Sequence, residues 1–492
     1  MVGNIFMKEY NPNSIALKFK GNDITYEQLD RTVNQYASLL SKLGVKAEER
    51  VLLSCPNSPE FIYSYMSVVK NGAIIVPMNL QLTMDEITYL INDSGAGYML
   101  IHPAVLKAIK HSKDSLQDLL GIKIIVLDEE FQHMISESPV EVIEGFTDEN
   151  AVSTFLYTSG TTGKPKAAML THKNLVTNAE QCRIAFSTTV DDNFMCVLPM
   201  FHVFGFTVSV LNPLWTGATV TILEKFHPKE VIDSFLNDDV TVFAGVPTMY
   251  VILLEACKNS VAFPNLRLAI SGGAAMPLEV LRQAKDILKL PVVEGYGLTE
   301  SSPVVSFNPL NGIQKTGSIG VPLQGIECKI VDEKDMELPA DYVGELITLG
   351  DNVMLGYYNK EKETAEALKN GWLYTGDLAK KDEDGYIYIV DRKKDLIIAS
   401  GLNVYPREVE EVIYQYSKVK EAAVVGIEDK LRGEFVKAFI VLKDGEECTS
   451  KEMLGYLKEH LAGYKLPRKI EFIAELPKNG SGKILKRMLK IQ

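Results

Sequence analysis

The chain has 492 residues, a length that favours two or more domains over a single core. Its 46% hydrophobic and 23% charged residues are typical of a soluble globular protein. The net charge of −13 argues against a general nucleic-acid binder, and the six cysteines, scattered with no close pair, suggest neither a zinc site nor a disulfide framework.

The amino-terminal segment lacks the features of a secretory signal, because Lys8 and Glu9 interrupt its apolar residues. No run elsewhere in the chain approaches the roughly 18 apolar residues of a transmembrane helix. We therefore expect a cytoplasmic protein with no integral membrane segment.

Short apolar runs alternate with helix-length segments through the first 300 residues. Residues 51–54 and 73–76 are strand candidates, and residues 26–43 are a candidate helix. The pattern sharpens further along, where the strand candidates are 194–198, 218–223, 240–245, 266–271 and 291–294. Short buried strands that alternate with helices imply parallel sheets, so this part is predicted to be an α/β body.

Beyond about residue 316 the chain becomes rich in turns, with shorter strand candidates at 328–331, 344–349 and 386–390. Five consecutive charged residues, 391–395, then precede a compact α+β unit. Its predicted elements are helices 406–416 and 450–461 and strands 422–426, 436–442 and 469–473. We place a boundary at the charged run, which gives a large domain, 1–391, that ends in a small β region, and a small domain, 392–492.

The most informative motif is the run Tyr-Thr-Ser-Gly-Thr-Thr-Gly-Lys-Pro-Lys at residues 157–166, which follows an apolar stretch. Glycines let backbone N–H groups turn toward an anion, hydroxyls donate to phosphate oxygens, and lysines add positive charge. The run is interpreted as a cradle for ATP phosphates, with the candidate ligands Thr158, Ser159, Gly160, Thr161, Thr162, Gly163, Lys164 and Lys166. The Walker A spacing is absent, which argues against a P-loop kinase or ATPase. A solvated surface loop is the alternative.

A second motif, Gly-Tyr-Gly-Leu-Thr-Glu at residues 295–300, follows a strand candidate, where open α/β sheets bind ligands. Gly295 and Gly297 let the ring of Tyr296 lie near a flat ligand. Thr299 can donate to phosphate, and the Glu300 carboxylate suits Mg²⁺. A simple turn is the alternative.

Three charged residues further along complete a nucleotide site. The Asp377 carboxylate suits ribose hydroxyls, and the Arg392 guanidinium can hold the same sugar or a phosphate. Lys483 lies in a Gly/Ser-rich loop near the carboxyl end. Surface charges and a frayed chain end are the alternatives.

In this order, the motifs resemble the adenylate-forming superfamily of acyl-CoA synthetases, carrier-loading adenylation domains and beetle luciferase, and the resemblance covers nearly the whole chain. It implies ATP and Mg²⁺ as cofactors, CoA as cosubstrate, and a carboxylic acid that is first adenylated and then transferred to a thiol. It also implies a small carboxy-terminal domain that is mobile and rotates between the two half-reactions.

The resemblance implies individual roles. Lys483 matches the family's adenylation lysine, Glu300 would hold Mg²⁺ beside the catalytic candidate Thr299, and Lys394 matches the family's hinge. Gly401 would let a pantetheine arm approach, and His202 would be a pocket residue near the acyl carboxylate and not a general base. The implied adenine and ribose contacts are Gly272, Gly273, Ala274, Glu294, Gly295, Tyr296, Gly297, Asp377 and Arg392. Glu294 stands where many relatives carry Gln or Asn, and Ala167 follows Lys166 where the family usually has glycine.

The predicted acid pocket comprises segments 203–206, 246–249 and 301–305, which are mostly apolar and hold no Lys or Arg for a second carboxylate. Its candidate lining residues are His202, Val203, Phe204, Val246 and Val304. A medium- or long-chain fatty acid is the first expectation and an aryl acid the second. An adenylation enzyme that loads a carrier protein, and a non-catalytic ATP- or acyl-binding regulator, stay open, as does assembly into a homodimer.

Overall fold

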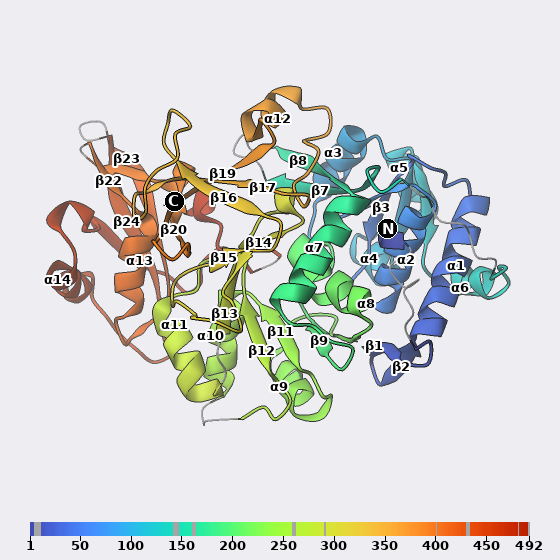
Figure 1. The fold of residues 1–492 in the computed structure, drawn as a ribbon, viewed down its shortest axis with the longest axis horizontal. Coiled ribbons are helices and arrows are strands. Elements are labelled where there is room, and N and C mark those ends of the chain that lie inside the picture. The colour runs from blue at the N-terminus through green and yellow to red at the C-terminus, as the bar shows by residue number, and fades with distance from the viewer. Residues whose placement is uncertain are drawn as a thin grey trace.

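The structure, a computed structural model, describes residues 1–3, 11–140, 146, 148–159, 164–257, 262–289, 292–399, 401–429, 433–480 and 482–490, with the backbone only at Ser159. Within these residues the strands form four sheets that are packed with helices (Figure 1). The predicted α/β fold, with a large amino-terminal body and a smaller carboxy-terminal α+β part, is confirmed.

A six-stranded sheet in the amino-terminal part has the order β6-β5-β3-β4-β7-β8, and β8 is antiparallel to β7. Its strands are β3 (Arg50–Ser54), β4 (Ile74–Pro77), β5 (Tyr98–Ile101), β6 (Lys123–Val126), β7 (Val152–Ser159) and β8 (Pro165–Thr171). Alternate residues of β3 enter different cores: Val51 and Leu53 lie in one cluster and Leu52 in another. Because both faces are buried, the three central residues of β3, 51–53, are all apolar.

The helices of this region supply the two cores. Residues of α1 (Tyr26–Lys42) and α2 (Pro59–Lys70) pack with Val51 and Leu53, whereas residues of α3 (Met84–Ser94) and α5 (Lys113–Leu120) pack with Leu52. Thr25 and Thr83 form capping boxes that fix the starts of α1 and α3. Shorter helices, α4 (Pro103–Ala108) and α6 (Glu129–Ser136), complete the region.

A nine-stranded sheet forms the centre of the body, with the order β15-β14-β13-β12-β11-β9-β10-β1-β2. Its strands are β1 (Ile15–Phe19), β2 (Asn22–Thr25), β9 (Asn193–Cys196), β10 (Thr219–Ile222), β11 (Val242–Gly245), β12 (Leu268–Ser271), β13 (Val292–Gly297), β14 (Val304–Phe307) and β15 (Val321–Pro322). The strands from β13 to β1 in this order are mutually parallel. The carboxyl ends of β13, β12, β11 and β9 therefore share one edge.

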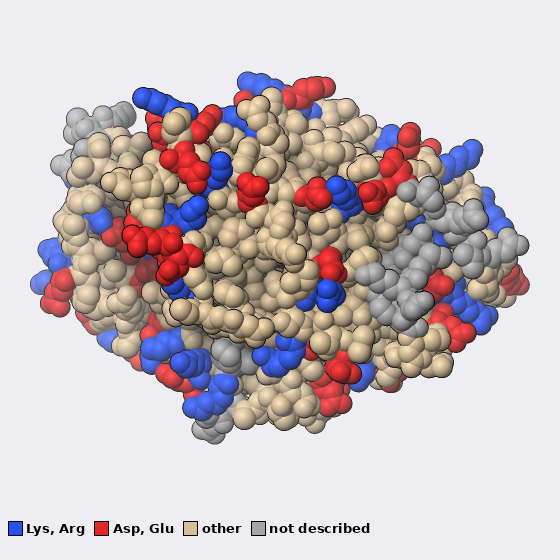
Figure 2. Space-filling model, in the orientation of Figure 1, with Lys and Arg blue, Asp and Glu red and all other residues tan. Residues whose placement is uncertain are grey.

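The helices that accompany this sheet are α7 (His172–Ala185), α8 (Asn212–Thr216), α9 (Pro228–Asn237), α10 (Pro247–Ala256) and α11 (Leu278–Gln283), together with a π-helix at Phe204–Leu211. No helix among the described residues is both long enough and apolar enough to cross a bilayer. Acidic and basic side chains are interspersed on the face drawn in Figure 2.

A third, antiparallel sheet comprises β16 (Glu327–Val331), β17 (Gly344–Leu349), β18 (Leu368–Lys369), β19 (Trp372–Lys381) and β20 (Ile387–Arg392), with α12 (Glu361–Ala367) beside it. The fourth sheet comprises β21 (Ile397–Ala399), β22 (Leu402–Val404), β23 (Val419–Asp429), β24 (Gly433–Leu442) and β25 (Lys469–Phe472). Its helices are α13 (Pro406–Tyr414), α14 (Ser450–His460) and α15 (Lys486–Leu489). The chain passes from the third sheet to the fourth through a short 3₁₀ turn at Lys393–Asp395.

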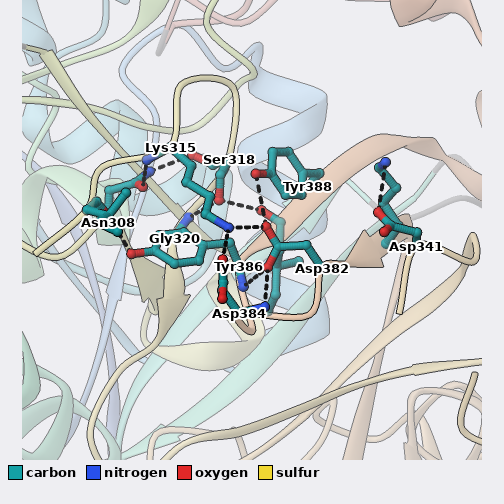
Figure 3. Close-up of polar contacts among 12 residues, drawn as sticks. Asn308, Lys315, Ser318, Gly320, Asp341, Asp382, Asp384, Tyr386 and Tyr388 are labelled. Carbon is teal, nitrogen blue, oxygen red and sulfur yellow. Dashed lines mark hydrogen bonds and ion pairs between the residues drawn. The ribbon is translucent and has the colours of Figure 1, made fainter. Parts of the chain in front are cut away.

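A polar network ties the β19–β20 hairpin to the segment that follows β14 (Figure 3). The Lys315 ammonium lies 2.7 Å from Oδ2 of Asp382 and 2.6 Å from Oδ2 of Asp384. Asn308 donates from Nδ2 to the Ser318 carbonyl at 2.6 Å. The network fixes the hairpin, which carries Asp377 and Arg392, against the edge of the nine-stranded sheet.

Candidate active site

The predicted adenine and acyl residues follow adjacent parallel strands and meet at one edge of the nine-stranded sheet. His202 comes after β9, Val246 after β11 and Gly272 after β12, while Tyr296 lies at the end of β13. A Cβ atom on Gly272 would lie 3.0 Å from the Phe204 ring. The expected adenine side and acyl side of the site are therefore in contact, as the carboxyl ends of an open α/β sheet predict.

Tyr296, Asp377 and Arg392 meet although they come from three strands. The Tyr296 hydroxyl donates to Oδ2 of Asp377 at 2.5 Å, and Nε of Arg392 lies 3.3 Å from Oδ1. Asp377 and Arg392 are register partners on β19 and β20. Asp377 is only 4% exposed, so the Arg392 charge balances a carboxylate that is largely withdrawn from water.

Glu294 is buried where the body meets α13. It accepts a hydrogen bond from the Met276 N–H at 3.3 Å, and burial raises its pKa to about 7 even though the Arg407 charge opposes that shift. Glu411 on α13 accepts a hydrogen bond from the Leu278 N–H at 3.2 Å. The sequence analysis did not identify Arg407 or Glu411, because charged residues on a helix usually face water.

The predicted phosphate loop connects β7 to β8. Four of its candidate ligands, Gly160, Thr161, Thr162 and Gly163, lie outside the described residues, as does the side chain of Ser159. Thr158 and Lys166 are register partners at the base of the hairpin, and Lys164 is exposed.

Helix α3 anchors both ends of this hairpin loop. The Tyr157 hydroxyl donates to Oδ2 of Asp93 at 2.9 Å, and the Tyr89 hydroxyl donates to the Pro165 carbonyl at 2.9 Å. Nζ of Lys360 lies 3.3 Å from Oδ1 of Asp93. Sequence analysis missed these anchors, whose only signal was the spacing of four residues between Tyr89 and Asp93, which places both on one helix face.

Glu300 lies in the 3₁₀ turn Thr299–Ser301 that follows β13. Oε1 accepts a hydrogen bond from the Tyr357 hydroxyl at 2.7 Å, and the Lys166 ammonium lies 4.8 Å from the centre of the Tyr357 ring. A half-buried carboxylate, linked through Tyr357 to a lysine of the predicted phosphate loop, fits Mg²⁺, which is held by one or two carboxylates together with substrate phosphates and water. No group of three or more potential metal ligands occurs among the described residues.

The loop that carries Lys483 lies against the body. Thr248 donates from Oγ1 to the Gly482 carbonyl at 3.4 Å, and a Cβ atom on Gly482 would lie 3.2 Å from Cγ2 of Val246. Gly482 has φ +84°, so both the conformation and the close approach require glycine. Burial and the charge of Arg392 lower the pKa of Lys483 to about 8.

The His202 ring, an expected pocket residue, is neutral. Its Nδ1 accepts a hydrogen bond from the Phe204 N–H at 3.2 Å, so the proton of the neutral ring is on Nε2. Burial and the nearby charge of Lys483 lower the pKa of His202 to about 4. The other expected lining residues, Val203, Phe204, Val246 and Val304, are all buried.

The expected hinge residue precedes β21, the first strand of the fourth sheet in chain order, and the expected thiolation residue follows that strand. Lys394 lies in the 3₁₀ turn that precedes β21, and burial lowers its pKa. Gly401 forms the β21–β22 turn with φ +82°, and a Cβ atom there would meet nothing within 4 Å. Gly273 also has a positive φ of +78°, whereas Ala274, which follows it, is exposed.

The chain matches two family models. The AMP-binding enzyme model matches residues 7–358, and the AMP-binding enzyme C-terminal domain model matches residues 408–483. The chain belongs to the AMP-binding enzyme family. The resemblance to adenylate-forming acyl-CoA synthetases that the motifs predicted is therefore confirmed.

Two curated relatives illustrate the range of acids in the family. A long-chain-fatty-acid–CoA ligase of Bacillus subtilis (strain 168) is 35% identical, over 97% of this chain and 91% of the relative. A feruloyl-CoA synthase of Amycolatopsis sp is also 35% identical, over 97% of this chain and 95% of the relative.

Solved structures of the family have the same architecture. ATP-bound MatB from Rhodopseudomonas palustris superimposes with a TM-score of 0.93 at 30% identity, covering 100% of this chain and 99% of that chain. Apo MatB gives a lower TM-score of 0.81 at 29% identity, covering 100% of this chain and 98% of that chain. The arrangement described here is thus closer to the ATP-bound form of that protein.

Proposed function

We propose that the protein is an ATP-dependent carboxylic acid–CoA ligase that works through an acyl-adenylate and acts on medium- or long-chain fatty acids. The observation that carries this proposal is the position of Lys483. Its loop lies on Val246 and Thr248, and its ammonium is within electrostatic range of Asp377, Arg392 and His202. A cation from the carboxy-terminal part is thereby brought to the edge where the acid and the nucleotide are expected to meet.

The first half-reaction joins the acid to AMP. A carboxylate oxygen attacks the α-phosphorus of ATP, and the bond to the leaving pyrophosphate breaks. Lys483 bridges the carboxylate and the α-phosphate and stabilises the charge that develops between them. No covalent bond to the protein forms.

The remaining residues hold the nucleotide. Tyr296 contacts the adenine, with Gly272 and its neighbours beside it, and Asp377 and Arg392 hold the ribose. The phosphate loop, including Thr158, Lys164 and Lys166, binds the β- and γ-phosphates. Magnesium bound by Glu300 next to Thr299 would neutralise phosphate charge. Glu294, which accepts a hydrogen bond from the Met276 N–H, would lie beside the adenine.

In the second half-reaction the CoA thiolate attacks the acyl carbonyl and AMP leaves. We propose that residues 392–492 form a mobile domain, that residues 1–391 form the body, and that Lys394 serves as the hinge between them. Rotation would then exchange the Lys483 loop for the turn at Gly401, where the pantetheine arm approaches the backbone. The change of sheet after Arg392 supports this division.

A fatty acid is the favoured acid because the expected lining is apolar and buried at Val203, Phe204, Val246 and Val304. Aryl acids are the second candidate class, since the feruloyl-CoA synthase relative is as similar as the fatty-acid ligase. A cytoplasmic location is supported by the six cysteines, all free thiols and five of them buried, which suits a reducing compartment.

The test is carboxylate-dependent ATP–pyrophosphate exchange over a panel of fatty and aryl acids, followed by addition of CoA to the active reactions. Exchange with aliphatic acids and formation of a CoA thioester are expected. Exchange without thioester would point to a carrier-protein acceptor. A protein that binds ATP but catalyses no exchange with any acid of the panel would contradict the proposed activity.

A further inference from the structure

Residues 354–358 extend the six-stranded sheet at its β8 edge. The Leu355 N–H donates to the Met169 carbonyl at 3.0 Å, and the Met169 N–H donates to the Gly356 carbonyl at 2.9 Å. The Tyr358 N–H donates to the Ala167 carbonyl at 2.9 Å. This pairing places Tyr357 opposite Ala168, two residues from Lys166 at the base of the phosphate loop.

The Tyr357 side chain joins two parts of the proposed ATP site. Its hydroxyl donates to Oε1 of Glu300 at 2.7 Å, and the Lys166 ammonium lies 4.8 Å from the centre of its ring. The same segment also holds the backbone of Glu300, because the Met354 N–H donates to the Glu300 carbonyl at 2.9 Å. Glu300 is therefore held by both its backbone and its carboxylate.

The chemistry of these contacts favours a fixed orientation. The Tyr357 phenol is a hydrogen-bond donor at neutral pH, and its hydroxyl is directed at the Glu300 carboxylate. A hydrogen bond to an ionised carboxylate is among the stronger ones in proteins. Among the described residues, the Tyr357 hydroxyl is the one side-chain donor to the Glu300 carboxylate, and it bonds Oε1. None of the described side chains donates to Oε2. The ring attracts the Lys166 ammonium through a cation–π interaction.

We propose that Tyr357 is a positioning residue for the first half-reaction, which orients the Glu300 carboxylate toward magnesium and holds Lys166 beside the same phosphates. The inference deepens the proposed function and rests on it. It also explains why a residue between a turn and α12, outside every motif of the nucleotide site, contacts two of that site's expected ligands.

The test is the magnesium dependence of ATP–pyrophosphate exchange in Tyr357→Phe, which removes the hydroxyl and keeps the ring under Lys166. We expect the Mg²⁺ concentration for half-maximal exchange to rise about tenfold, the usual effect of losing one hydrogen bond to a charged group. Thiolation of supplied acyl-adenylate and the melting temperature should match the wild type. Tyr358→Phe is the matched control, because Tyr358 packs on Phe155 with ring centres 4.7 Å apart, and its magnesium dependence should not change.

An unchanged magnesium requirement in Tyr357→Phe would overturn the proposal, and so would equal losses in both half-reactions. A second variant, Glu300→Asp, withdraws the carboxylate from the hydroxyl and leaves Tyr357 intact. It should raise the magnesium requirement in the same way, and a wild-type requirement there would equally contradict the proposal. If the wild-type protein shows no exchange with any acid, the proposed function fails first. If the wild type is active, Glu300→Asp raises the magnesium requirement and Tyr357→Phe behaves like the wild type, only this inference fails.

Discussion

The pH dependence of adenylation should follow the ionisation of Lys483. Its ammonium is partly withdrawn from water and lies near Arg392, which lowers its pKa to about 8 in the nucleotide-free protein. The charged fraction then falls from about nine-tenths at pH 7 to about one-tenth at pH 9. We expect kcat/KM for ATP to fall about tenfold per pH unit above pH 8, because the reaction needs the charged form.

The assay is ATP–pyrophosphate exchange between pH 6.5 and 9.5 at constant ionic strength, with saturating acid and subsaturating MgATP. Lys483→Arg is the matched control, since its guanidinium stays charged over this range. That variant should be slower but show no alkaline decline. Glu294 has a pKa of about 7 and would also titrate in this pH range, so the profile is repeated in a Glu294→Gln background. The rate of thiolation of supplied acyl-adenylate should not fall above pH 8 in this way, because that step does not use Lys483.

The lowered pKa also fixes the sign of the effect on stability. The folded protein disfavours the Lys483 ammonium, so the unfolded chain binds more protons between about pH 8 and the ordinary lysine value of 10.5. The contribution of this group to the free energy of unfolding therefore rises with pH in that window. Deprotonation of Lys483 stabilises the folded protein between about pH 8 and 10.5, so it cannot cause a loss of exchange activity through unfolding. An alkaline decline that persists in Lys483→Arg, or a wild-type profile without one, would show that the Lys483 charge does not set the pH dependence of exchange.

Three further predictions concern the rest of the site. Asp93→Asn should weaken the contacts to Tyr157 and Lys360 and raise the KM for ATP in exchange roughly tenfold, with thiolation unchanged; an unaltered KM would contradict the anchoring role. Asp377→Ala should slow both half-reactions, measured by single turnover, because both bind the AMP moiety; loss of only one would argue against ribose binding. Burial raises the pKa of Glu294 to about 7, so the wild-type protein loses stability as pH rises from about 4.5 through 7 and this carboxyl group must ionise in the folded state. Glu294→Gln removes that cost. The variant should gain on the order of 2 kcal/mol in unfolding free energy at pH 8 and much less at pH 5, and equal gains at both would contradict the burial argument.

Several elements were predictable because their signals are local. The short strand predicted at 344–349, within a glycine- and turn-rich region, is found at Gly344–Leu349. The strand expected at 422–426 instead spans Val419–Asp429, because ladder hydrogen bonds with β24 continue past the apolar residues. Pairing of the backbone does not require apolar side chains, so the sequence pattern underestimates the length.

The missed site residues depend on contacts between distant segments. Tyr357 reaches Glu300 across 57 residues, and Tyr157 reaches Asp93 across 64. Asp93 lies on an amphipathic helix and Arg407 on another, where a charged residue ordinarily faces water. Neither composition nor spacing within one element distinguishes such a residue from a solvated one. The glycine- and lysine-rich motifs were identifiable because their chemistry is contained in a few consecutive residues.

Comparison of the two half-reactions in Lys483→Ala shows whether this lysine serves adenylation. The rate of acyl-adenylate formation is measured in single turnover with ATP and acid, and thiolation is measured separately with supplied acyl-adenylate and CoA. We expect adenylation to fall by at least about a hundredfold, as when one charge-stabilising group is removed, and thiolation to stay within a few-fold of the wild type. Adenylation at the wild-type rate in the folded variant would contradict the account.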